Sequence, residues 1–127
     1  MRVFLACPFT AYLDPTQGVI RSEYRRAIEF FRNESCGKCV PCRIGTDWIH
    51  KIIQRITHGQ GRPEDIDLLR GACINLGGTR MMDSRSFCPL GDAAAWPIIW
   101  GGLKYFREEF EEHVRHRGCP MDGYGKV

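Results

Sequence analysis

The sequence predicts a mainly α-helical fold, a bundle of about four helices with a short N-terminal extended segment. Two observations carry this prediction. Apolar residues recur at intervals of three and four in four stretches after residue 22, and glycine or proline separates these stretches. Only residues 2–6 favour a β-strand. A chain of 127 residues with 43% hydrophobic residues is expected to form one domain with an ordinary core.

The first two helices are expected on either side of a cysteine-rich loop. Ser22 is a candidate cap for a helix that runs to about Asn33. A second helix is expected to begin at an N-cap, Thr46, and to end at Gly59. Their apolar faces consist of Tyr24, Ala27, Ile28 and Phe31 in the first helix, and Trp48, Ile49, Ile52, Ile53 and Ile56 in the second.

The last two helices are expected after proline or aspartate. Pro63 suits a first helical position, and this third helix is expected to end at Gly77-Gly78. Asp92 is a candidate cap for a long fourth helix. Its apolar stripe is Ile99, Leu103, Phe106, Phe110 and Val114. The glutamates Glu108, Glu109, Glu111 and Glu112 are expected on its solvated face.

These elements divide the chain into three parts. Residues 1–25 form an N-terminal extension of strand and loop, residues 26–117 a helical metal-binding domain, and residues 118–127 a flexible tail. The formal net charge of +3 gives no indication of nucleic-acid binding. No segment approaches the roughly 18 consecutive apolar residues of a membrane span. We therefore expect no membrane insertion and a cytoplasmic location.

Seven cysteines are present, and three of them form a tight run. Cys36, Cys39 and Cys42 are each separated by two residues, so that their thiolates can converge on one inorganic centre. This spacing with a fourth, distant cysteine is typical of iron–sulfur proteins, and Cys88 is the fourth candidate. The pattern favours a [4Fe–4S] cluster. The alternative is a structural zinc site in an interaction module, although zinc sites more often use two separated Cys-x-x-Cys pairs.

Two long motifs resemble a known family. Glu34-Ser-Cys-Gly-Lys-Cys-Val-Pro-Cys-Arg43 and Ser86-Phe-Cys-Pro-Leu-Gly-Asp-Ala-Ala-Ala-Trp-Pro97 are similar to the iron–sulfur signatures of the NADH-binding flavoprotein subunit of respiratory complex I, also found in NAD-linked hydrogenases and formate dehydrogenases. The resemblance covers roughly residues 27–117. It implies a helical bundle that holds one [4Fe–4S] cluster, with the ligands Cys36, Cys39, Cys42 and Cys88.

The resemblance also implies a function as an electron relay. In the family, NADH reduces FMN, and electrons then pass singly through this cluster to further iron–sulfur centres in neighbouring subunits. Because no glycine-rich nucleotide loop is present, FMN and NADH are expected only through another domain or partner, and the chain alone is not expected to oxidise NADH. The implied location is cytoplasmic, peripheral on a membrane complex. Lys38, Arg43 and the backbone near Gly37 are candidates to tune the cluster potential.

The N-terminal extension resembles a different family. Val3-Phe-Leu-Ala-Cys-Pro-Phe-Thr10 is similar to the first strand and loop of nucleoside 2-deoxyribosyltransferase-like proteins. The rest of that fold is absent, so residues 1–25 are interpreted as a remnant, a fusion or a divergent start. A nucleotide-processing activity is the third hypothesis for the chain.

The remaining cysteines and histidines are expected to have no part in the site. Cys73 falls on the apolar face of the third helix and is expected in the core. Cys7 is expected to be structural, and Cys119 receives no role. No nucleophile-and-base pair indicates a catalytic residue. Surface positions are expected for all four histidines, His50, His58, His113 and His116.

Overall fold

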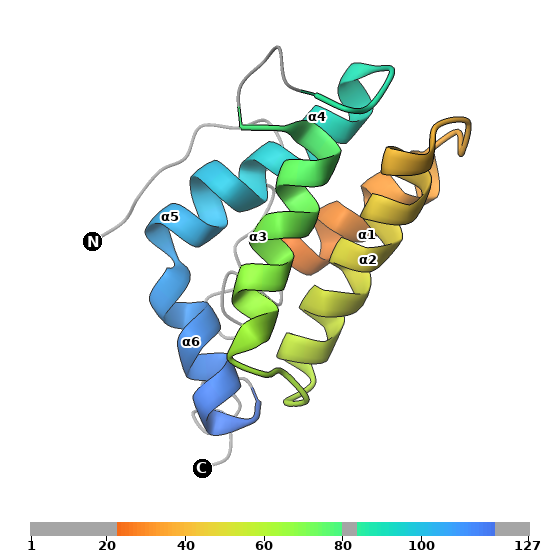
Figure 1. Ribbon diagram of the computed structural model, residues 1–127. Helices are drawn as coiled ribbons and strands as arrows, with labels where there is room; N and C mark the ends of the chain where they lie inside the picture. Colours follow the sequence, from red (N-terminus) through yellow and green to blue (C-terminus); the bar gives the residue numbers. More distant parts are fainter. Residues whose placement is uncertain (1–22, 80–83, 119–127) are drawn as a thin grey trace.

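Helix α2 (Val40–Thr57) is the central element of the fold (Figure 1). It packs against α1 (Arg25–Glu34) and α3 (Glu64–Gly77). The chain then continues through α4 (Pro89–Trp96), a π-helical turn η2 (Pro97–Gly102), α5 (Leu103–Tyr105) and α6 (Arg107–His116). The computed structural model describes residues 23–79 and 84–118, and in these ranges it contains helices and no strands. The mainly helical class is therefore confirmed for this part of the chain.

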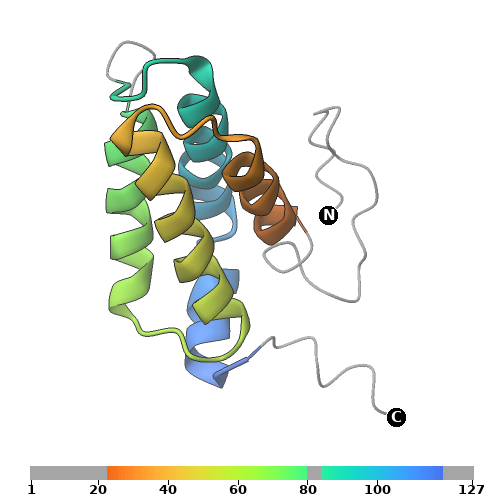
Figure 2. The same ribbon diagram turned by 90° about the vertical axis from the view of Figure 1, so that its right-hand side faces the viewer.

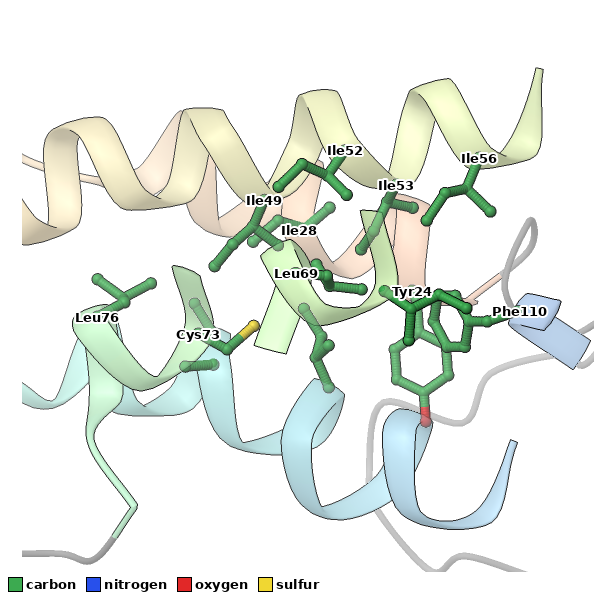
Figure 3. Close-up of a cluster of buried hydrophobic side chains, with 14 of the residues drawn as sticks. Tyr24, Ile28, Ile49, Ile52, Ile53, Ile56, Leu69, Cys73, Leu76 and Phe110 are labelled. Atoms are coloured by element: carbon green, nitrogen blue, oxygen red, sulfur yellow. The ribbon is translucent and has the colours of Figure 1, made fainter. Parts of the chain in front are cut away.

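The core lies between these helices and is built from the predicted periodicity (Figure 3). Ile49, Ile53 and Ile56 of α2 are fully buried, as are Leu69 and Leu76 of α3. Spacings of three and four place these side chains on one helix face. The ring centroids of Tyr24 and Phe110 lie 6.4 Å apart and close the core between α1 and α6.

The start of α2 differs from the prediction. The helix begins at Val40, inside the cysteine run, and the expected cap Thr46 lies in its interior. Pro41 explains the early start, because the first helical turn tolerates the missing N–H of proline. The Thr46 hydroxyl is satisfied instead by donating to the Cys42 carbonyl at 2.7 Å, one turn earlier.

The C-terminal helical run also differs from the single long helix predicted from Asp92. Helix α4 begins at Pro89, with Asp92 in its first turn. The run then widens into η2 and breaks at Phe106, whose backbone is non-helical. Glycine explains part of this irregularity, since a Cβ on Gly102 would lie 3.2 Å from the Tyr24 ring. The predicted apolar stripe nevertheless packs on the core.

The ends of α2 and α3 agree with the prediction. Gly59 has a φ of +78° and follows the last turn of α2. The carbonyl of Arg117 fills the place that a side chain on Gly59 would occupy, so the turn between α2 and α3 lies against the C-terminal end of α6. Helix α3 ends at Gly77, and Gly78 has a φ of +67°. The expected strand at residues 2–6, the Ser22 cap, and the tail from residue 119 lie outside the described residues.

Candidate metal centre

The two cysteine segments lie at the same end of the bundle (Figures 1 and 2). The loop between α1 and α2 carries Cys36 and ends at Cys39, which is the N-cap of α2. Cys42 lies in the first turn of that helix. Cys88 is in turn the N-cap of α4. Both cap residues have extended backbone conformations, so each cysteine stands where a helix begins.

The four thiols differ in exposure. Cys39 and Cys42 are buried, whereas Cys36 and Cys88 are exposed. The side chain of Phe87, next to Cys88, is 89% exposed. None of the described cysteines forms a disulfide with another. The site therefore has an inner pair of sulfurs against the core and an outer pair at the surface.

Electrostatic effects connect the two segments. A hydrogen bond from the Phe87 backbone, with a second from Cys42, lowers the pKa of the Cys39 thiol. Burial raises the pKa of Cys42, and a hydrogen bond with Ser35 opposes this rise. Negative charge on Cys39, Cys88 and Cys36 raises it further. All four thiols are thus close enough to influence one another, although two of them belong to different segments.

The cysteine loop is held by its own hydrogen bonds. Gly37 has a φ of +71°, a conformation that favours glycine. Its carbonyl accepts a hydrogen bond from Arg43 Nη1 at 3.0 Å. Its N–H donates to Ser35 Oγ at 3.4 Å, and Ser35 Oγ lies 3.2 Å from Cys42 Sγ. These contacts tie the loop to the first turn of α2.

The chemistry of the donor set fits a thiolate-bound metal group. Thiolates are soft ligands that select iron–sulfur clusters and zinc. A centre with four thiolates is negatively charged, and the positive N-terminal ends of α2 and α4 would stabilise it. Within residues 23–79 and 84–118, no three His, Cys, Asp or Glu side chains have metal-binding geometry. The described thiols are therefore neighbours that are not arranged around one point.

Most of the other predicted positions agree with the structure. Cys73 is fully buried, and burial raises the pKa of its thiol to about 12, as expected of a core cysteine. Lys38 and Arg43 are exposed, and Arg43 contacts Gly37. Cys7 and Cys119 lie outside the described residues.

The prediction for one histidine was wrong. His113 is fully buried, whereas His58 and His116 are exposed and His50 is partly exposed. His113 Nδ1 lies 2.8 Å from the Glu109 carbonyl, so a hydrogen bond to the preceding turn makes its burial possible.

Two contributors to the site were not identified from the sequence, the Ser35 side chain and the Phe87 backbone. Ser35 directly precedes the first cysteine, and spacing alone gives a serine there no role. The Phe87 contact depends on how the second segment approaches the first, which is a tertiary feature. The one signal in the sequence was proximity to a predicted ligand.

The described helices give no indication of a membrane span, since none of them combines sufficient length with sufficient hydrophobicity. The inner part of the bundle is a protein core, and the apolar residues of α2 are used there.

Comparisons with known proteins agree with this site. The family described as the NADH-ubiquinone oxidoreductase-F iron-sulfur binding region matches residues 22–113. The F-type subunit of the NADH-quinone oxidoreductase of Streptomyces coelicolor is 48% identical over 109 residues, which are 86% of this chain and 22% of that protein. The corresponding protein of Mycobacterium tuberculosis H37Rv is 46% identical over 86% of this chain and 23% of its own length.

A further relative shows the same proportions. An F-type subunit of the NADH-quinone oxidoreductase of Rhizobium meliloti is 45% identical over 76% of this chain and 21% of its own length. The chain thus spans about a fifth of the length of the curated relatives that it matches.

Proposed function

The chain belongs to the family of the NADH-ubiquinone oxidoreductase-F iron-sulfur binding region, and from this premise we propose that it is a [4Fe–4S] electron-relay module. The proposed ligands are Cys36, Cys39, Cys42 and Cys88. When bound, such a cluster accepts and releases one electron at a time. The observation that carries the proposal is the contact between the two segments, in which the Phe87 backbone beside Cys88 donates to the Cys39 thiol.

The residues of this chain have three tasks in the proposal. The thiolates hold the metal, and the starts of α2 and α4 stabilise its negative charge. Buried Cys39 and Cys42 anchor the site against the core, which keeps water from one side. Exposed Cys36, Cys88 and Phe87 leave the other side open to a redox partner.

The source and the destination of the electrons are placed outside this chain. We propose that NADH and FMN bind to another domain or chain, and that further iron–sulfur subunits accept the electrons. The support is family membership together with the names of the relatives, which are subunits of NADH-quinone oxidoreductases. A cytoplasmic location, peripheral on a membrane complex, follows from the same reasoning.

Metal analysis of the full chain tests this proposal. We expect about four iron and four acid-labile sulfide per chain after anaerobic reconstitution, with an EPR signal after reduction. Zinc without sulfide would instead make the chain a structural zinc module. Base exchange or glycosidic hydrolysis by the isolated chain would support the nucleoside-processing hypothesis for residues 1–25.

A further inference from the structure

A short series of hydrogen bonds ends on the sulfur of Cys42. Arg43 Nη1 donates to the Gly37 carbonyl at 3.0 Å, and the Gly37 N–H donates to Ser35 Oγ at 3.4 Å. Ser35 Oγ in turn lies 3.2 Å from Cys42 Sγ. Each step joins the loop to the first turn of α2, so the Ser35 hydroxyl is held in place from two directions.

The direction of the last hydrogen bond follows from its partners. A cysteine that binds metal is a thiolate and has no proton to donate. The Ser35 oxygen already accepts from the Gly37 N–H, which leaves its own hydrogen available for the sulfur. Ser35 is therefore the donor and Cys42 the acceptor.

The surroundings of Cys42 strengthen this interaction. Only 4% of Cys42 is exposed, and Ser35 is partly buried. Hydrogen bonds to charged groups are stronger than those between neutral groups, and they gain further strength where water is excluded. Hydrogen bonds to sulfur are also one of the features by which a protein sets the reduction potential of an iron–sulfur cluster.

We propose that Ser35 is a positioning residue that raises the reduction potential of the centre by donating a hydrogen bond to the Cys42 thiolate. The inference rests on the proposed function. A cluster gains negative charge when it is reduced, and a donor at its ligand sulfur stabilises the more negative state more strongly. Loss of the hydroxyl should therefore make the cluster harder to reduce.

The test compares midpoint potentials in EPR-monitored redox titrations of the reconstituted full chain. We expect Ser35→Ala to shift the reduced-to-oxidised ratio at a fixed potential by up to about tenfold towards the oxidised form, equivalent to ~59 mV for one electron. Ser35→Thr, which keeps a hydroxyl, should restore most of the wild-type potential. Both variants should contain as much iron and sulfide as the wild type.

Ser86→Ala is the matched control. Ser86 stands two residues before Cys88, but its hydroxyl donates to the Leu76 carbonyl at 3.0 Å, which is not a sulfur. Its removal should leave the midpoint potential unchanged. An equal shift in Ser86→Ala and Ser35→Ala would mean that any disturbance near a ligand has this effect, and it would overturn the proposal.

A second readout is the exchangeable proton near the reduced cluster. Pulsed EPR in H2O and D2O should detect a coupled proton in the wild type and in Ser35→Thr that is missing in Ser35→Ala. An unchanged potential and proton signal in Ser35→Ala would refute the role of Ser35. Loss of the cluster from both Ser35→Ala and Ser35→Gly would also refute it, since a tuning hydroxyl is not needed for assembly.

These outcomes are separate from a failure of the proposed function. Wild-type protein that binds zinc without sulfide would reject the electron relay before any variant is compared. A wild-type cluster with an unchanged potential in Ser35→Ala would reject only the inference about Ser35.

Discussion

The two ends of the bundle use the same helices in different ways. At the cysteine end (residues 35–42 and 84–91), α2 and α4 begin, and their first residues are thiols. At the packed end (residues 49–69 and 106–118), α2 and α3 are joined by a short turn over buried isoleucines and leucines. There, side chains of the chain itself pair with one another, as Arg55 does with Asp65.

This difference indicates a division of tasks between the two ends. The packed end has the apolar burial that stabilises a fold, and its polar contacts lie within the chain. The cysteine end has a loop with a left-handed glycine and only two of its four proposed ligands buried. We therefore expect changes at the cysteine end to affect metal content, and changes at the packed end to affect the free energy of unfolding.

The largest expected effect is the loss of the metal centre. Replacement of Cys36, Cys39, Cys42 or Cys88 by alanine should each remove most of the iron and sulfide, because three thiolates leave one iron unprotected. Cys73→Ala is the control. It should retain the metal, because Cys73 lies in the core of α3. Full iron and sulfide in Cys88→Ala would show that the fourth ligand is assigned incorrectly.

A smaller effect is expected from the packed end. Leu69 is fully buried, and Leu69→Ala should lower the free energy of unfolding by about 2–5 kcal/mol through lost burial and a cavity. Chemical denaturation monitored by circular dichroism would measure this change. The neighbouring Leu68 is 46% exposed, and Leu68→Ala should change the free energy by no more than about 0.5 kcal/mol. Equal losses in both variants would contradict the described core.

The smallest expected effect concerns the ion pair between α2 and α3. Arg55 Nε donates to Asp65 Oδ2 at 3.0 Å, and Arg55 Nη2 contacts the other carboxylate oxygen. The Asp65 side chain is 3% exposed, whereas that of Arg55 is 39% exposed. Arg55→Ala should therefore lower the free energy of unfolding by about 1–3 kcal/mol, less than the loss of a fully buried pair.

An exposed pair provides the comparison for that variant. Arg107 and Glu111 are 3.0 Å apart and both well exposed. Arg107→Ala should alter the free energy of unfolding by only about 0.5 kcal/mol in the same denaturation experiment. A loss in Arg107→Ala as large as that in Arg55→Ala would show that burial of Asp65 does not determine the difference.

The sequence was a good guide where periodicity decides the structure. The faces of Ile49, Ile52, Ile53 and Ile56 were predicted because their spacing specifies one side of a helix. Gly59 was predicted as a stop because its backbone conformation favours glycine.

The sequence was a poorer guide where two signals compete. Thr46 and Asp92 both have the side chains of helix caps, yet both helices begin earlier, at or beside a proline. Proline at the first turn was the stronger signal, and it moves the helix starts onto the cysteines themselves. The burial of His113 and the contact of Ser35 with Cys42 depend on tertiary packing and local rotamers, which spacing does not specify.

The length of α2 separates the two ends electrically. The helix has 18 residues and so extends about 27 Å from the cysteine end to the turn at Gly59. Charges in physiological salt are screened over about 8 Å. A unit of charge added or removed at the thiols is therefore little felt at Arg55 and Asp65, so the bundle can change its charge at one end while the ion pair at the other end keeps its strength.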